Sequence, residues 1–120
     1  MRDHTKLRVF ALADTLVLAV YRASSGFPTN EQYGLQSQMR CAAVSIATNI
    51  VEGCARSTQK EYVRFVEIAY GSARELEYEI SLCERLGFLA ADMSMDLQNQ
   101  CVATAKGLSG LLRALRETLR

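Results

Sequence analysis

The sequence predicts an all-α protein that folds as an up-down-up-down antiparallel four-helix bundle. Apolar residues recur at steps of three and four along several long segments, which places them on one face of a helix. Nearly half of the 120 residues are apolar, and one proline and seven glycines suit a helical globule better than a β-sandwich or a disordered chain. No segment alternates as a strand does. We expect a single domain over residues 1–120.

The first helix is expected from about Asp3 to Ala23, with apolar residues over much of its circumference. One apolar stripe comprises Phe10, Ala13, Val17 and Val20. A second stripe beside it comprises Val9, Leu12, Leu16 and Ala19. A helix of this kind is either wedged deeply between its neighbours or contacts another subunit. The second stripe is therefore a candidate subunit interface.

The second helix has a start signal at Thr29, which we expect to act as N-cap, with Gln32 three residues later in the position of a capping box. Phe27 before it and Tyr33 after it are placed to close as a hydrophobic staple. We expect the helix to extend from this signal to about Glu52.

Gly53 is the expected terminator of the second helix. Thr58 and Glu61 form a second capping box, which starts a third helix that continues up to Gly87. Asp92 or Ser94 can then cap a fourth helix. The apolar face of this last helix comprises Leu97, Cys101, Thr104, Leu108, Leu111 and Leu115.

The charges are unevenly distributed, although the net charge is only +1. Antiparallel helices bring residues 1–13, 43–72 and 105–120 to one end of the bundle, with ten basic and five acidic side chains. The remaining residues, at the other end, carry four basic and eight acidic side chains. We call these the basic end and the acidic end. The candidate RNA- or partner-binding residues of the basic end are Arg2, Lys6, Arg8, Arg56, Lys60, Arg64, Arg113, Arg116 and Arg120.

A basic end of this kind attracts phosphates or an acidic protein surface. The alternative is that its charges only solvate the helix ends, where the helix dipole favours cations at the last turn. Tyr62 and Phe65 are the only aromatic residues among these cations, so the sequence gives little support for base stacking.

The connection between the second and third helices carries a polar corner formed by Asn49, Glu52, Gly53 and Glu61. Asn49, Glu52 and Arg56 share one helix face if the helix persists, so Glu52 can pair with Arg56. Asn49 can bond to the backbone or hold a facing helix in register. The corner is thus either a structural polar clasp or a patch that recognises a partner.

The sequence offers no constellation for catalysis, a metal or a cofactor. His4 is the only histidine, and the four cysteines lack metal-ligand spacing, so we expect free thiols in a reducing, cytoplasmic setting. Glu75, Glu77 and Glu79 turn toward different faces, and we expect a solvated acidic surface there. The apolar run from Val9 is interrupted by Asp14, short of the ~20 residues that span a membrane. We expect neither an enzyme nor a small-molecule substrate.

Several motifs together match one family pattern. They are Phe27-Pro28, Tyr33-Gly34-Leu35-x-Ser37-Gln38-Met39-Arg40-x-Ala42-Ala43-x-Ser45-Ile46, Asn49-Ile50-x-Glu52-Gly53, Arg56, Lys60-Glu61-Tyr62, Gly71-Ser72-x-x-Glu75-Leu76-Glu77 and Leu86-Gly87-Phe88-Leu89. With them the chain resembles the four-helix bundle family encoded in intervening sequences of bacterial 23S ribosomal RNA genes. The resemblance implies a ring-like homopentamer. The chain is also similar to the accessory variability determinant of diversity-generating retroelements, a bundle that binds a reverse transcriptase and nucleic acid.

The residues and the resemblance together favour a non-enzymatic, oligomeric binding or scaffold protein associated with RNA or the ribosome. The alternative is an accessory subunit that binds a reverse transcriptase or another protein partner.

Overall fold

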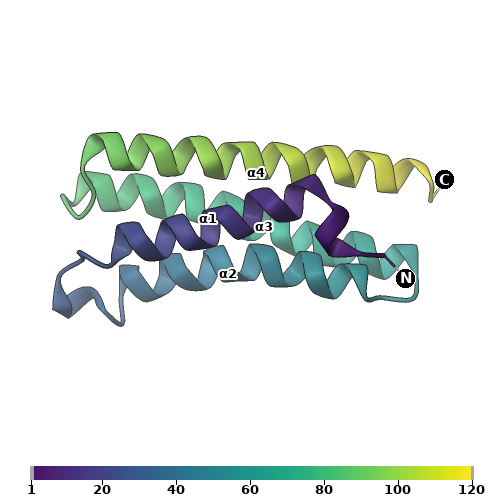
Figure 1. Ribbon diagram of the computed structural model, residues 1–120, viewed down its shortest axis with the longest axis horizontal. Helices are drawn as coiled ribbons and strands as arrows, with labels where there is room; N and C mark the ends of the chain where they lie inside the picture. The colour runs from purple at the N-terminus through teal and green to yellow at the C-terminus, as the bar shows by residue number, and fades with distance from the viewer. Residues whose placement is uncertain (1, 120) are drawn as a thin grey trace.

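The computed structural model describes residues 2–119, and its four long helices pack as an antiparallel bundle (Figure 1). The helices are α1 (Arg8–Ser24), α2 (Leu35–Cys54), α3 (Gln59–Arg85) and α4 (Ala91–Glu117). Two short 3₁₀ helices, His4–Lys6 and Thr29–Glu31, precede α1 and α2. Helices α1 and α3 each pack against both α2 and α4. The bundle measures 47 × 22 × 20 Å. The predicted fold class, an all-α four-helix bundle, is confirmed.

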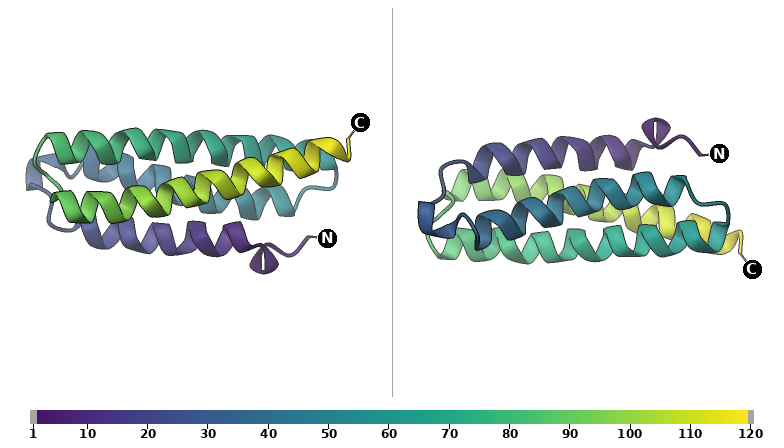
Figure 2. Two further views of the ribbon diagram at one scale, coloured as in Figure 1. Left: turned by 90° about the horizontal axis from the view of Figure 1, so that it is seen from above. Right: turned by 90° about the horizontal axis from the view of Figure 1, so that it is seen from below.

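The chain runs up and down the bundle in sequence order. The described chain ends and the α2–α3 connection lie at one end in each view, and the α1–α2 and α3–α4 connections lie at the other (Figures 1 and 2). The core between the helices is continuous. Its largest fully buried side chains include Leu16, Met39, Ile46, Ile50, Leu76, Ile80, Leu97 and Leu108. Each such side chain contributes roughly 1.5–3 kcal/mol by leaving water.

The expected start of α1 at Asp3 is wrong. The Asp3 carboxylate accepts a hydrogen bond from the Thr5 backbone N–H at 3.0 Å and so caps the short 3₁₀ helix. Leu7 is extended and ends this turn, and α1 then begins at Arg8. Asp is a favoured N-cap residue, and here it caps the 3₁₀ turn that precedes α1.

The expected cap of α2 at Thr29 is also wrong. Residues 29–31 form a 3₁₀ turn, and α2 begins only at Leu35. The first N–H of α2, that of Leu35, donates to Oε1 of Glu31 at 3.1 Å. A glutamate therefore takes the place of the predicted Thr29 and Gln32 box. Acidic groups are favoured at this position by the partial positive charge of a helix N-terminus.

The predicted staple between Phe27 and Tyr33 does not form. Tyr33 is 90% exposed, whereas Phe27 is buried. The Phe27 ring packs against Phe88, with ring centroids 5.7 Å apart. Phe27 thus joins the α1–α2 connection to the α3–α4 connection at the acidic end.

Both predicted boundaries of α3 are confirmed. At the start of α3, the Thr58 hydroxyl accepts a hydrogen bond from the Glu61 backbone N–H at 3.2 Å. At its end Gly87 has φ +82°, a conformation that a side chain disfavours. The Phe88 N–H donates to the Cys83 carbonyl at 2.9 Å, which completes a Schellman motif.

The start of α4 differs from the prediction, because neither Asp92 nor Ser94 caps it. Ala90 is the N-cap and makes no side-chain hydrogen bond. Ser94 is buried one turn inside the helix. The predicted apolar face is buried from Leu97 to Leu108, after which Leu112 replaces Leu111 as the most buried leucine.

Candidate interface at the basic end

The basic end is held together by Arg2, which reaches across the α2–α3 connection. Its guanidinium donates to the Arg56 carbonyl at 2.8 Å and to Oε1 of Gln59 at 3.2 Å. It also lies over the Tyr62 ring, 4.3 Å from the centroid. Gln59 in turn donates to the Thr118 hydroxyl at 2.7 Å. Arg2 is therefore a structural residue, although the sequence placed it among the binding candidates.

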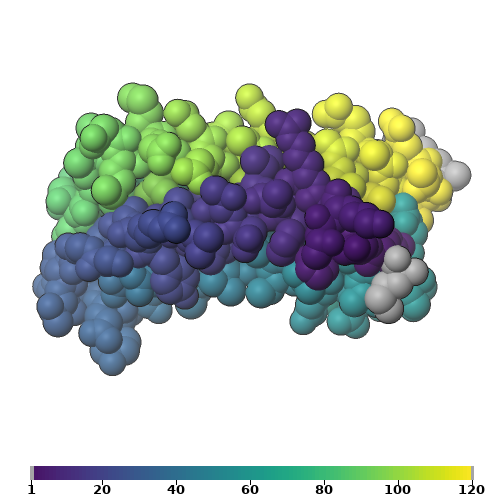
Figure 3. Space-filling model, in the orientation of Figure 1, coloured from purple at the N-terminus to yellow at the C-terminus, as the bar shows by residue number. Residues whose placement is uncertain are grey.

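These bonds join three separate parts of the chain into one surface. The N-terminal segment, the α2–α3 corner and the last turn of α4 lie side by side at this end (Figure 3). Cations that are distant in the sequence therefore lie at one end of the bundle, as antiparallel threading predicted.

Two further candidate cations are paired with acidic neighbours. Arg56 lies 3.5 Å from the Glu52 carboxylate, as predicted, and its guanidinium covers the Phe65 ring at 4.9 Å. Arg116 on α4 pairs with Glu67 on α3 at 2.5 Å. Both pairs are largely exposed, so each stabilises the fold by about 0–1 kcal/mol.

The remaining candidates point to solvent. Each is exposed and forms no ion pair with any residue between 2 and 119. They are Lys6, Arg8, Lys60, Arg64 and Arg113, and Lys106 on α4 behaves in the same way. Arg120 lies outside the described residues. The side chains that could contact a ligand at the basic end are thus fewer than the sequence suggested.

Tyr62 and Phe65, the two aromatic residues that the sequence offered for base stacking, are already covered by arginines. Tyr62 is buried beneath Arg2, and Phe65 is half-buried beneath Arg56. Burial and the neighbouring Cys54 raise the pKa of the Tyr62 hydroxyl to about 12, so it stays protonated. Neither ring offers a free face for base stacking.

The polar corner is built around Asn49, as a short hydrogen-bonded chain between α2 and α3. The Asn49 amide donates to the Ser45 carbonyl at 2.8 Å and to the Ser45 hydroxyl at 3.0 Å. That hydroxyl is 2.9 Å from the hydroxyl of Ser72 on α3. These hydrogen bonds link α2 to α3, as the structural-clasp interpretation expects. Ser72 was not predicted, because no periodicity signals a hydroxyl that meets another across a helix pair.

Gly53 has a different role from the predicted helix terminator. It lies inside α2, which ends one residue later. A Cβ added at Gly53 would lie 3.0 Å from Cβ of Phe65 and 3.1 Å from Cδ1 of Tyr62. The absence of a side chain therefore lets α2 approach α3 closely at the corner. Glu61, the fourth corner residue, serves in the cap of α3.

The candidate subunit interface on α1 is corrected in part. Val9 and Leu16 are buried within the bundle, so a second subunit cannot reach them. Leu12 and Ala19 are half-buried. The most exposed large apolar residue of α1 is Leu18, at 50%, which belongs to neither predicted stripe.

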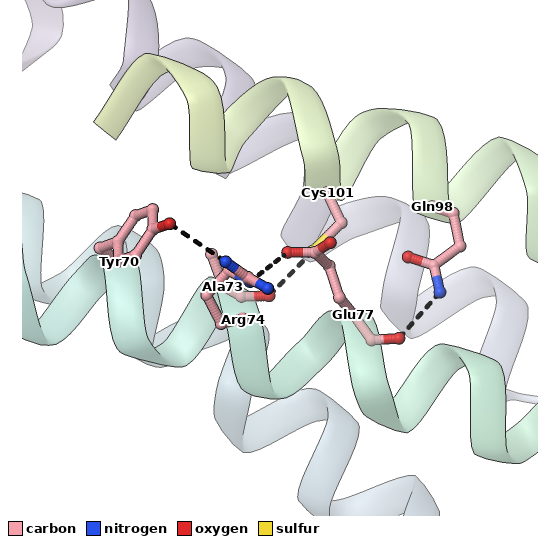
Figure 4. Close-up of polar contacts among 6 residues, drawn as sticks. All are labelled: Tyr70, Ala73, Arg74, Glu77, Gln98 and Cys101. Carbon is pink, nitrogen blue, oxygen red and sulfur yellow. Dashed lines mark hydrogen bonds and ion pairs between the residues drawn. The ribbon is translucent and has the colours of Figure 1, made fainter. Parts of the chain in front are cut away.

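At the acidic end, Arg74 and Arg40 are bonded to other groups of the chain. Arg74 is 3.1 Å from Glu77 and donates to the Tyr70 hydroxyl at 3.2 Å (Figure 4). Arg40 donates to the buried Ser24 hydroxyl at 2.8 Å. These arginines stabilise contacts within the chain and are not presented as a patch.

The buried cysteines are packing residues. The Cys101 thiol is 3.3 Å from the Ala73 carbonyl, to which it donates across the α3–α4 seam (Figure 4). Burial, followed by the charge of Glu77, raises the pKa of Cys101 to about 12. Burial likewise raises the pKa of Cys83 to about 11. Protonated thiols of this kind are poor nucleophiles and poor metal ligands.

Residues 2–119 bring together no group of three histidine, cysteine or carboxylate side chains that could hold a metal ion. Over the same residues, no helix is long and apolar enough to cross a membrane. The His4 ring packs edge-on against Phe10, at 4.7 Å between centroids. The fold and its surface therefore define a four-helix bundle protein with exposed cations at one end.

Comparison with known proteins identifies the family. Residues 5–110 match the model of the 23S rRNA-intervening sequence protein family, so the chain belongs to that family. It is similar in fold to a solved structure from Bacteroides thetaiotaomicron, described as a protein with unknown function from the S23 ribosomal protein family. The TM-score is 0.81 at 17% identity, covering 88% of this chain and 95% of that chain. No curated protein matches the chain.

Proposed function

We propose that this chain is a non-enzymatic binding protein whose basic end contacts the phosphates of RNA. The observation that carries the proposal is a set of exposed cations, from three parts of the chain, that form no ion pair among residues 2–119. Lys60 and Arg64 lie one turn apart on α3, Arg113 lies on α4, and Arg8 starts α1. Among the described residues, the acidic side chains Glu52 and Glu67 are already taken up by other arginines.

The expected ligand is RNA bound through its backbone. Because Tyr62 and Phe65 are covered by arginines, stacking cannot supply sequence preference, and phosphate contacts carry the affinity. The descriptions of the matching family and of the similar structure, which refer to 23S rRNA and to a ribosomal protein family, also support RNA as the first ligand to test.

A matched pair of double variants tests the proposal. Lys60→Glu with Arg64→Glu reverses two exposed charges at the basic end, and Arg22→Glu with Arg85→Glu reverses two at the acidic end. Fluorescence anisotropy with a labelled single-stranded RNA should show an affinity loss of about tenfold or more for the first pair only. Equal RNA affinities in the two variants contradict the proposal.

The same variants address the alternative, an accessory subunit that binds a reverse transcriptase or another protein. In a pull-down from native lysate, the RNA proposal predicts that ribonuclease releases the captured material. Capture that resists ribonuclease but is lost in the basic-end variant identifies an acidic protein surface as the ligand instead.

We also propose that the chain assembles into a homo-oligomer, and the family resemblance suggests a pentamer. Exposed apolar side chains on two helices support assembly: Leu18 and Tyr21 on α1, and Ile68 and Tyr78 on α3. Light scattering at micromolar concentration should give a mass several times that of the chain. A monomeric mass contradicts this part of the proposal.

A further inference from the structure

Glu79 on α3 is a buried carboxylate without a partner. The sequence predicted a solvated acidic surface for Glu75, Glu77 and Glu79, and for Glu79 that is wrong, because its side chain is only 5% exposed. Its Oε1 atom is buried and makes no hydrogen bond to any residue from 2 to 119. No ion pair of Glu79 occurs among residues 2–119. A buried charge is normally paired or hydrogen-bonded, so this arrangement needs an explanation.

Glu79 lines a groove of about 450 Å³ between α2 and α3, the helix pair seen side by side in Figure 2. Glu75, one turn before it, lines the same groove. Ser37 and Gln38 on α2 add polar groups, and Leu35 and Leu82 add apolar walls. The groove therefore combines two carboxylates with an aliphatic surface.

Three arginines of the acidic end form ion pairs or hydrogen bonds with groups other than Glu79. Arg74 pairs with Glu77, and Arg40 bonds to Ser24 and Tyr21 on α1. Arg85 bonds to the Ser81 carbonyl and lies 5.9 Å from the centroid of the Tyr78 ring. The counter-charge for Glu79 therefore does not come from these arginines.

We propose that this groove binds a guanidinium or primary ammonium group carried on an aliphatic stem. The cationic head would meet Glu79 and Glu75, because charge-assisted hydrogen bonds to a carboxylate are short and strong. The stem would lie along Leu35 and Leu82, and a planar guanidinium could also stack on Tyr78. A metal ion fits less well, since no third ligand of the usual kind converges there among the described residues.

The raised pKa of Glu79 agrees with a buried carboxylate that has no counter-charge among the described residues. Burial, followed by the charge of Glu75, raises the pKa of Glu79 to about 7. The other titratable groups that line the groove are Cys41 and Tyr78. A cation that binds the charged carboxylate should therefore bind more tightly at pH 8 than at pH 5.5.

Two sources could supply this chemistry: a free aliphatic cation, or an arginine of a second copy of the chain. For the first, agmatine is titrated into the protein at pH 8 by isothermal calorimetry. Glu79→Gln should weaken binding at least tenfold and Glu75→Gln about threefold, while Glu84→Gln, at an exposed position outside the groove, should leave it unchanged. Circular dichroism of each variant confirms that the helices are intact.

For the second source, sedimentation velocity compares the wild-type chain with Glu79→Gln. A shift of the variant to smaller species, reproduced in the wild type by added agmatine, supports an arginine donated by a second copy. Agmatine binding that is equal in the wild type and Glu79→Gln overturns the proposal. So does the absence of agmatine binding together with an unchanged sedimentation profile. Neither arm depends on whether the basic end binds RNA.

Discussion

At the basic end most of the described cations point to solvent, whereas at the acidic end most are held by hydrogen bonds within the chain. Lys60, Arg64 and Arg113 are exposed without ion pairs among residues 2–119, but Arg40 and Arg74 are bonded to neighbouring helices or side chains. The difference shows that charge counts locate a patch but do not establish its availability. Arg2, the exception at the basic end, is bonded as fully as any arginine at the other.

The largest effect we expect comes from Glu79, and it appears in the pH dependence of stability. Its pKa is raised from 4.5 to about 7 on folding, so the folded chain holds this proton more tightly than the unfolded chain. The contribution of protonated Glu79 to stability is fully present below pH 4.5 and is lost as the pH rises through about 7, by up to about 3 kcal/mol. Urea unfolding of the wild type and Glu79→Gln at pH 4, 6 and 8 measures the difference.

Glu79→Gln should remove that fall and be the more stable chain at pH 8. Glu84→Gln, at an exposed position, is the control and should follow the wild type at every pH. A wild-type stability that is flat between pH 4.5 and 7, relative to Glu79→Gln, would mean that the carboxylate is solvated and that the two ends differ less than we describe.

The next effect separates the two kinds of arginine at the basic end. Arg2→Ala removes hydrogen bonds to the Arg56 carbonyl and to Gln59 and uncovers Tyr62, which should cost about 1–3 kcal/mol of unfolding free energy. Arg8→Ala should change stability by less than about 0.5 kcal/mol, because Arg8 is exposed and forms no ion pair among residues 2–119. Thermal unfolding of both variants decides. Equal losses would mean that Arg2 is not structural.

The clasp at Asn49 should have a smaller effect. Asn49→Ala removes the two bonds to Ser45 and loosens its contact with Ser72, at a cost of about 1 kcal/mol. Thr48→Ala is the control, since its hydroxyl is exposed and bonds only within α2. A clasp that serves the fold predicts a lower melting temperature without a change in RNA affinity. If RNA affinity falls while the melting temperature holds, Asn49 recognises a partner instead.

The smallest effect concerns the exposed ion pair between Glu52 and Arg56. Glu52→Ala should lower stability by less than about 0.5 kcal/mol, because both side chains are in contact with water. The same substitution frees Arg56, so RNA binding should strengthen slightly. A loss of more than about 1 kcal/mol in chemical unfolding would show that this pair supports the corner as strongly as Asn49 does.

The sequence predicted the bundle, its polarity and the placement of its cations because helical periodicity and antiparallel threading depend on local spacing. It predicted Thr58 and Gly87 correctly, since caps and positive-φ glycines act within a few residues. Other start signals of the same kind failed, because Thr29 and Asp92 do not cap α2 and α4. The remaining failures were contacts between distant residues. Gly53 resembles a helix terminator until Phe65 and Tyr62 are seen to pack against it.

The same limit explains the candidate sites. Burial of Glu79 depends on how α2 packs against α3. Arg2 is not available as a free cation because it donates to the Arg56 carbonyl, 54 residues away in the sequence. Neither the burial of Glu79 nor the hydrogen bond of Arg2 can be predicted from residue spacing or composition. Val9 and Leu16 show the opposite error, since their apolar stripe is filled by the chain itself and not by a second subunit.

The most direct test of the basic end is the salt dependence of RNA binding. The slope of the logarithm of affinity against the logarithm of salt concentration is about −0.7 per neutralised phosphate for single strands. We predict that the triple variant Lys60→Gln, Arg64→Gln, Arg113→Gln flattens this slope by about two. A slope that is the same in the wild type and the triple variant would contradict the claim that these exposed cations bind RNA.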